Sequence, residues 1–131
     1  MRAAINHFEN KLKFETDSWD VKAAMDNQEK MLVIDVRTKE AYENEHIPQA
    51  INLHHKAIDE TSTENLDKDF LYVTYCDGIG CNASTKGALK MTKLGFRTKE
   101  LMGGIDWWKR DGYRTEGKNG EQAVDISCNC D

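Results

Sequence analysis

Two short apolar segments constrain the fold of this chain most strongly. "MLVIDV" occupies residues 31–36, and "FLYVTY" occupies residues 70–75. Continuous apolar runs of this length are typical of strands that are buried on both faces, as in parallel sheets. Stretches with helical spacing lie between and after these runs. The chain therefore predicts βα units in a parallel sheet with helices on both faces, which is an α/β fold.

Weaker local signals predict the remaining elements. Further short strands are expected within residues 12–16, 50–53 and 98–104. Helices are expected within residues 17–28, 38–47, 84–94 and 105–112, with a helical turn at 62–67. Asp17 or Ser18 and Thr38 are candidate N-caps, and Gly95 is placed to end a helix. In the helix over 84–94, the residues expected to face inward are Ala88, Leu89, Met91 and Leu94.

The composition fits a single domain. The chain has 131 residues, with 18 basic and 23 acidic side chains and a formal net charge of −5. This balance argues against a protein that binds nucleic acid or a membrane surface. Charges run through the N-terminal region where a secretory signal needs an apolar core, so we expect a cytoplasmic protein. Residues 1–114 are expected to form the domain, and residues 115–131 a polar, poorly ordered tail that ends in Cys-x-Cys.

The loop "TYCDGIGCNAS" is the candidate reactive site. Cys76 directly follows the second apolar run and precedes a predicted helix, and reactive groups gather at such places in parallel sheets. Backbone N–H groups of the loop and the positive end of the helix would favour a thiolate. Gly78 and Gly80 would supply the unusual φ angles of a tight loop. Ser84 or Thr85 could cap the helix.

Other interpretations of the cysteines stay open. A cysteine at the end of a buried strand can simply be a small apolar side chain. Cys81 could attack a sulfur on Cys76 and form a disulfide, provided that their Cα atoms lie within about 7 Å. Cys76, Cys81, Cys128 and Cys130 could also supply four zinc ligands. However, the C-x₄-C spacing is at the limit for a zinc knuckle and the C-x-C spacing is too tight, which disfavours this site.

Four segments resemble, in order, the signature segments of rhodanese-like domains. They are "VIDVRTKEAYENEHIPQAINL", "YVTYC", "STKGALKMTKLGF" and "LMGGIDWW". The resemblance implies a small three-layer α/β/α domain with sulfurtransferase activity. In this family a single cysteine, which maps to Cys76, accepts sulfane sulfur as a persulfide and passes it to a nucleophile. The implied partners are a sulfur donor (a small persulfide, thiosulfate or a protein persulfide) and a thiol acceptor. No metal or organic cofactor is implied.

Several matched positions are interpreted as structural. Asp35 and Arg37 correspond to the family's "DVR" and are expected to form a buried charged pair. His46 is expected to hold a turn by hydrogen bonding, because no acid–base partner is evident. The pair "GG" at 103–104 suits a backbone turn. Trp108 suits a core aromatic, whereas Trp107 could be exposed and line a substrate entrance.

The loop departs from the family pattern. Seven residues, 77–83, separate Cys76 from Ser84, which makes the loop longer than is usual. Ala83 stands where arginine is common, so a bidentate partner for an oxyanion such as thiosulfate is missing. Lys86 is a candidate substrate contact in its place. We therefore expect weak thiosulfate activity and a persulfide donor. The residues expected to surround the thiolate are Asp77, Gly78, Ile79, Gly80, Cys81 as a resolving thiol, Asn82, Ala83 and Ser84.

Two other functions use the same loop. The chain could be a non-catalytic redox-sensing or binding module that acts through Cys76 and Cys81. An arsenate reductase or phosphatase-like enzyme is the less favoured alternative. Phosphatase chemistry needs an arginine at the end of the loop, and residues 77–83 contain none.

Overall fold

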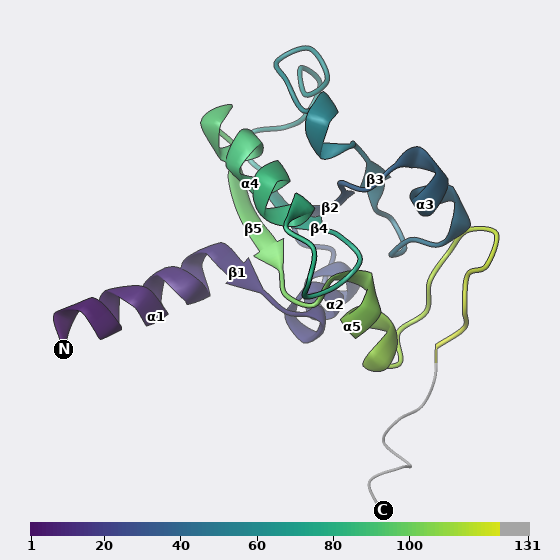
Figure 1. Cartoon of the computed structure of the whole chain (residues 1–131), viewed down its shortest axis with the longest axis horizontal. Coiled ribbons are helices and arrows are strands. Elements are labelled where there is room, and N and C mark those ends of the chain that lie inside the picture. The colour runs from purple at the N-terminus through teal and green to yellow at the C-terminus, as the bar shows by residue number, and fades with distance from the viewer. Residues whose placement is uncertain (124–131) are drawn as a thin grey trace, which may run out of the picture.

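Five parallel strands form the centre of the molecule (Figure 1). The computed structural model describes residues 1–123. The strands are β1 (Glu15–Thr16), β2 (Met31–Asp35), β3 (Ile51–Asn52), β4 (Leu71–Tyr75) and β5 (Arg97–Leu101). Their order in the sheet is β1-β5-β4-β2-β3. The two apolar runs of the sequence are thus the adjacent inner strands β2 and β4, which pair along five residues each.

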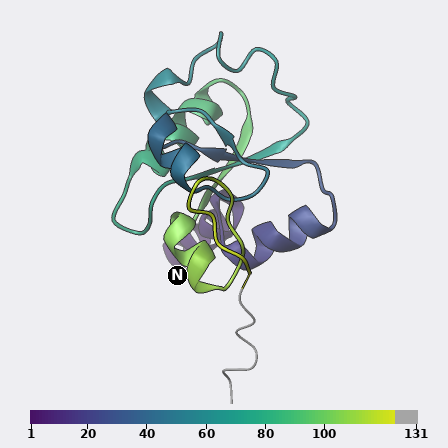
Figure 2. The ribbon, with the colours of Figure 1, turned by 90° about the vertical axis from the view of Figure 1, so that its right-hand side faces the viewer.

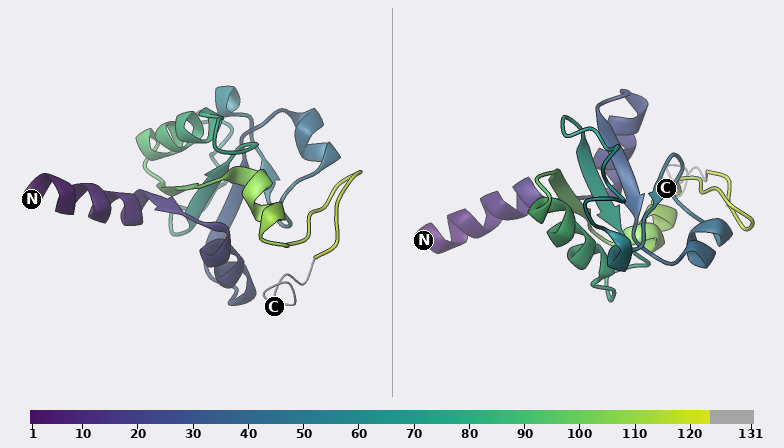
Figure 3. Two further views of the ribbon diagram at one scale, coloured as in Figure 1. Left: turned by 60° about the horizontal axis from the view of Figure 1, so that its bottom comes forward. Right: turned by 90° about the horizontal axis from the view of Figure 1, so that it is seen from above.

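Helices cover both faces of this sheet, so the predicted α/β fold is confirmed (Figures 2 and 3). The helices are α1 (Arg2–Phe14), α2 (Ser18–Asp26), α3 (Lys39–Asn44), α4 (Ala83–Lys93) and α5 (Gly104–Arg110), with a short 3₁₀ turn, η1 (His55–Ala57). Among residues 1–123, no helix is both long enough and apolar enough to pass through a membrane.

Alternation along the inner strands creates two cores. Val33 and Val73 point to one face, where α2 and α5 contribute Val21 and Trp108. Neighbouring strand residues point to the opposite face, where α4 covers the sheet. The residues buried there are Ile34, Val36, Ile58, Tyr72, Met91 and Phe96. Burial on both sides explains why these strands are apolar throughout, since each face must exclude water.

The predicted helix boundaries follow from local chemistry. The Asp17 carboxylate accepts the N–H of Asp20 at 2.9 Å, and the Thr38 hydroxyl accepts the N–H of Ala41 at 3.2 Å. Both are N-cap bonds, which satisfy backbone donors that have no partner within the helix. Gly95 takes φ of +91° just after α4 and so ends that helix.

One expectation about local structure is wrong, that Leu89 faces inward, and the strand expected within 12–16 is present only in part. Residues 12–16 are mostly the end of α1, which was not expected, and the strand there is two residues long. No residue of α1 is buried, and the helix extends away from the sheet edge (Figure 1). Leu89 is 54% exposed, because the inward face of α4 is formed by residues such as Met91. The helical turn expected within 62–67 is present: the N–H of Thr63 donates to the Asp59 carbonyl at 3.2 Å, and the N–H of Leu66 donates to the Thr63 carbonyl at 3.0 Å.

The chain from Thr115 is not poorly ordered at its start. Thr115 is buried, and its hydroxyl donates to a carboxylate oxygen of Glu45 at 2.6 Å. Glu116 and His46 exchange both backbone N–H···O bonds, at 2.8 and 2.9 Å. These polar residues are ordered because they form hydrogen bonds with Glu45 and His46, which directly follow α3. Cys128 and Cys130 lie outside the described residues.

A buried ion pair joins the carboxyl ends of β2 and β4, as the sequence predicts. Asp35 is fully buried, and Arg37 reaches its two oxygens with Nε at 3.0 Å and Nη2 at 2.8 Å. The Tyr75 hydroxyl donates to Asp35 Oδ2 at 2.6 Å and accepts the N–H of Ile47. Burial raises the pKa of Tyr75, and the Asp35 charge raises it further. Burial alone would lower the pKa of Arg37, but its bonds and charge interaction with Asp35 outweigh that effect and raise it.

Replacing Asp35 by alanine should destabilise the protein strongly. The substitution leaves the Arg37 guanidinium buried without its partner, which costs about 3–5 kcal/mol in comparable sites. Urea unfolding of Asp35→Ala and wild type measures the difference.

The control is Lys39→Ala, which breaks an exposed pair with Glu43 whose nitrogen and oxygen lie 4.0 Å apart. It should change the free energy of unfolding by about 0.5 kcal/mol or less. An Asp35→Ala variant as stable as this control would contradict the structural role of the buried pair.

Candidate active site

Cys76 is the first residue after β4, the central strand of the sheet. It is 3% exposed, and the loop that it begins leads into α4. The structure therefore places the predicted nucleophile at the carboxyl edge of the sheet, as the apolar run before it suggested. In open α/β sheets this edge is where ligands bind.

The start of α5 holds the first residues of the loop. The N–H of Ile105 donates to the Cys76 carbonyl at 3.0 Å, and the N–H of Asp106 donates to the Asp77 carbonyl at 2.9 Å. This close approach requires glycine, because a Cβ on Gly104 would lie 2.2 Å from the Cys76 carbonyl oxygen. Gly103 and Gly104 have φ of +81° and +57°. The predicted glycine turn is present, and it packs directly against the reactive loop.

Gly78 and Gly80 do not play the part expected of them. Among the described residues, the glycines with positive φ are 95, 103, 104, 112 and 117, so neither loop glycine is left-handed. The turn instead closes through the N–H of Cys81, which donates to the Gly78 carbonyl at 3.3 Å. The left-handed backbone that shapes the site lies in the neighbouring 103–104 turn.

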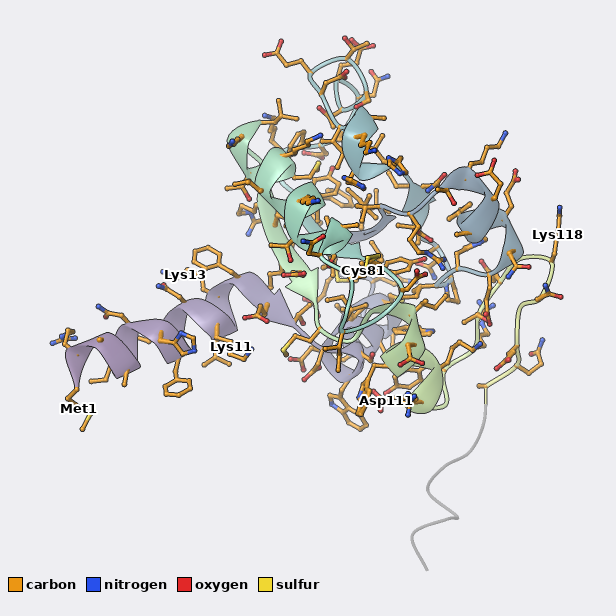
Figure 4. All side chains as sticks on the ribbon, viewed as in Figure 1. Met1, Lys11, Lys13, Cys81, Asp111 and Lys118 are labelled. Carbon is orange, nitrogen blue, oxygen red and sulfur yellow. A yellow bond between two sulfur atoms is a disulfide. The ribbon has the colours of Figure 1, made fainter. Side chains whose placement is uncertain are left out.

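Cys76 and Cys81 are joined by a disulfide. Their Cα atoms are 6.3 Å apart, within the usual limit of about 7 Å for a disulfide. Figure 4 labels Cys81 in the loop that precedes α4. The loop thus brings the two thiols together, as one of the sequence interpretations required. Within residues 1–123, no group of three or more His, Cys, Asp or Glu residues is arranged to hold a metal ion.

Arg37 connects the loop to the buried ion pair. Its Nη1 donates to the exposed Asp77 carboxylate at 3.1 Å, and its Nη2 donates to the Glu45 carbonyl at 2.6 Å. His46, the next residue, donates from Nδ1 to the Tyr42 carbonyl at 2.7 Å, which agrees with its predicted role in holding the turn. Within the described part of the chain, Arg37 carries the only guanidinium bonded to the loop. Its N–H groups are already engaged by the Asp35 and Asp77 carboxylates and the Glu45 carbonyl.

The start of α4 differs from the sequence prediction. Asn82 is the N-cap residue, and its side chain forms no capping bond. Ser84 and Thr85 do not cap the helix; both hydroxyls donate to Oε2 of Glu100, each at 2.6 Å. Ala83 is half-buried against the α4 side of the core, so the position where the family often has arginine faces apolar side chains.

A cavity of about 430 Å³ opens beside the disulfide. Its lining residues are Lys11, Glu15, Asp17, Gly78, Ile79, Cys81, Ser84, Glu100, Leu101, Met102, Gly103 and Trp107. Trp107 is 44% exposed and lines the cavity as expected, whereas Lys86 is exposed and does not. Glu100, Lys11 of α1 and Glu15 of β1 were not among the site residues expected from the sequence. No motif marks them, because they meet the loop only through the sheet order β1-β5-β4.

The match to a known family agrees with this geometry. A family model for the rhodanese-like domain matches residues 18–111, more than half of the chain. The chain belongs to the rhodanese-like family. The family resemblance seen in the sequence is thus confirmed. The matched range runs from the start of α2 to just beyond α5 and includes every strand except β1.

Individual relatives include named sulfurtransferases. The thiosulfate sulfurtransferase GlpE of Coxiella burnetii is 32% identical over 95 residues, covering 71% of this chain and 81% of the relative. The adenylyltransferase and sulfurtransferase UBA4 of Candida albicans is 30% identical over 108 residues, covering 76% of this chain but only 24% of the relative. The crystal structure of protein BH2092 from Bacillus halodurans has a TM-score of 0.87 at 38% identity, covering 98% of this chain and 96% of that one.

Replacing Gly104 by alanine should disrupt the loop, because a Cβ there collides with the Cys76 carbonyl. We expect a loss of about 2–4 kcal/mol in the free energy of unfolding, from strained φ and overpacking. The matched control is Gly80→Ala in the same loop, where a Cβ would meet no atom within 4 Å. Thermal and urea unfolding compare the two variants. Equal stabilities would contradict the contact between the α5 turn and the loop.

Proposed function

We propose that this protein is a sulfurtransferase that carries sulfane sulfur as a persulfide on Cys76 and passes it to a thiol acceptor. The observation that carries the proposal is the position of Cys76, a buried sulfur at the end of the central strand. Its loop is fixed by α5 on one side and leads into α4 on the other. The sulfurtransferase names of two relatives support the same reaction class.

The proposed reaction is two displacements at sulfur. In the first, the Cys76 thiolate attacks the terminal sulfur of a donor persulfide. The donor S–S bond breaks, the donor leaves as a thiolate, and the sulfur with its proton remains on Cys76 as a persulfide. In the second, an acceptor thiolate attacks that terminal sulfur, and Cys76 leaves as a thiolate. No electron carrier is consumed, because one S–S bond replaces another in each step.

The first turn of α4 supports an anion on Cys76. The backbone N–H groups of Ala83, Ser84 and Thr85 belong to this turn and so have no acceptor within the helix. Their partial positive charge favours a thiolate or a persulfide anion in the loop. The missing arginine at position 83 and the seven-residue loop favour a persulfide donor over thiosulfate, which needs a fixed cation.

The Cys76–Cys81 disulfide supports a second role for the loop. The Cys81 thiolate would attack the Sγ atom of persulfidated Cys76. The disulfide would then form, and hydrosulfide would leave with the transferred sulfur. The sulfane sulfur is reduced and the two cysteines are oxidised, so an external dithiol must reduce the disulfide before another cycle. A non-catalytic redox sensor would form the same disulfide without accepting sulfur first.

Peptide mass spectrometry after treatment of the reduced protein with a sulfane donor tests the proposal. The peptide that contains Cys76 should gain the mass of one sulfur atom. Cys76→Ser should gain none and should lose sulfur transfer to an added thiol. Cys81→Ser is the matched control, since it removes the other thiol of the loop, and it should still be loaded. Sulfur transfer that persists in Cys76→Ser would rule out the assignment.

Sulfide release tests the role of Cys81. Reduced, persulfidated protein without an acceptor should release one hydrosulfide per chain and lose its free loop thiols. Under the same conditions, Cys81→Ser should keep its persulfide. A methylene-blue sulfide assay and thiol titration measure the two quantities. If both proteins keep the persulfide equally long, Cys81 does not resolve it. If wild type forms the disulfide but never accepts sulfur, the redox-sensor function holds instead.

A further inference from the structure

The cavity beside the loop carries more negative than positive charge. Three carboxylates line it, from Glu15, Asp17 and Glu100, against the single ammonium group of Lys11. Lys11 Nζ lies 3.2 Å from both carboxylate oxygens of Glu15, so these two charges largely offset each other. Within residues 1–123, neither Glu100 nor Asp17 forms an ion pair, so the cavity is acidic toward a small molecule that enters it.

Glu100 lies on β5, the strand beside β4, and lines the cavity. In the β4–β5 register it stands opposite Thr74, two residues before Cys76. Its Oε2 atom accepts the Ser84 and Thr85 hydroxyls, and both residues lie in the first turn of α4. The carboxylate is thus held at the positive end of that helix. A fixed negative charge there opposes the binding of any further anion.

The remaining lining suits a short carbon chain. Ile79, Met102 and Trp107 are apolar, are partly or largely exposed, and border the same cavity. The methylene groups of a small organic molecule would pack against these side chains, with a positively charged end directed toward the Glu100 carboxylate. The sulfur end would then face the loop at Cys81, which lines the cavity; Cys76 is 3% exposed, does not line the cavity, and is reached through its contact with Cys81.

We propose that Glu100 determines the specificity of the site, so that the cavity accepts small thiols that carry a positively charged amino group and disfavours anionic ones. This inference rests on the proposed function, because it concerns the acceptor that takes sulfur from Cys76. Attraction between an ammonium group and the Glu100 carboxylate holds the aminothiol in place. Repulsion by the same carboxylate excludes an anionic thiol and also weakens thiosulfate binding.

The acceptor reaction consumes only the aminothiol and the Cys76 persulfide. The aminothiol thiolate attacks the terminal sulfur of the Cys76 persulfide, and a new S–S bond forms between acceptor and sulfur. The persulfide bond breaks, and Cys76 takes the electron pair as a thiolate. The proton of the terminal sulfur stays with the product, a small aminopersulfide. Glu100 acts through position and charge and forms no covalent bond.

The test uses three thiols of similar size: cysteamine, which is cationic; 2-mercaptoethanol, which is neutral; and 3-mercaptopropionate, which is anionic. Each reacts with Cys81→Ser that has first been persulfidated on Cys76, so that Cys81 cannot drain the sulfur. Mass spectrometry follows the loss of the persulfide with time. The measured quantity is the ratio of the cysteamine rate to the 3-mercaptopropionate rate within one protein. This ratio does not depend on the active fraction of a preparation.

Adding Glu100→Gln should lower this ratio by about tenfold, the effect of about 1.4 kcal/mol of lost charge interaction. The change for 2-mercaptoethanol should be small, and comparing proteins with the same three thiols cancels their intrinsic reactivities. The matched control is Glu40→Gln, which removes one negative charge from the exposed surface of α3. It should leave the ratio unchanged.

The experiment distinguishes a failure of the acceptor inference from a failure of the proposed function. If Cys76 is loaded and unloaded normally but Glu100→Gln and Glu40→Gln have the same ratio as the parent, Glu100 does not select the acceptor, and the sulfurtransferase function stands. If Cys76 never carries sulfur, the proposed function fails, and the acceptor inference fails with it.

Discussion

The buried contact between Asp35 and Arg37 is the interaction on which the geometry of the site depends. Asp35 is fully shielded from water, and Arg37 is almost so. Charges in such a place are tolerated only when each hydrogen-bonding position is filled in a defined geometry. Tyr75, at the end of β4, donates to the same carboxylate. The residue immediately before Cys76 is therefore fixed by a network that has little freedom to rearrange.

Two separate elements, Arg37 and α5, hold the start of the loop. Arg37 reaches the side chain of Asp77, while the first turn of α5 bonds the carbonyls of Cys76 and Asp77. The loop then turns at Gly78 and enters α4, with Cys81 close enough to bond Cys76. A rigid beginning and an internal turn explain how a longer loop still presents one sulfur at one position. They also explain how a second thiol comes within reach.

Charge at the site results from two opposing influences. The unpaired N–H groups at the start of α4 favour an anion on Cys76. Glu100 and Asp77 place carboxylates near the same loop, without an arginine at position 83 to offset them. In the mechanism that we propose, a persulfide anion on Cys76 and a cationic small thiol from solution satisfy both influences.

Features that depend on neighbouring residues in the chain, such as the buried strands, could be predicted from the sequence. Contacts between residues that only the strand order brings together could not. The apolar run before Cys76 predicted that this residue lies at the carboxyl end of a buried strand, and the structure places it directly after β4. The Asp35–Arg37 pair followed from family resemblance and the cost of burying charge. Glu100 could not be found, since it meets Ser84 only through pairing of β4 with β5. The α1 helix was missed although Ile5, Phe8 and Leu12 recur at helical spacing; in the structure this apolar stripe is exposed and packs on no core.

The central claim is that Cys76, and not Cys81, carries the sulfur in a loop whose framework stays unchanged. Crystal structures of the Cys81→Ser and Cys76→Ser variants, each soaked with a persulfide donor, test it most directly, because Cys81 cannot then release the sulfur from Cys76 as sulfide. In Cys81→Ser we predict density for one additional sulfur bonded to Sγ of Cys76, with Asp35, Arg37 and the α5 turn in the positions described above. Additional sulfur on Cys81 in Cys76→Ser, or a bare Cys76 thiol in crystals of Cys81→Ser when the same donor loads that variant in solution, would contradict this assignment.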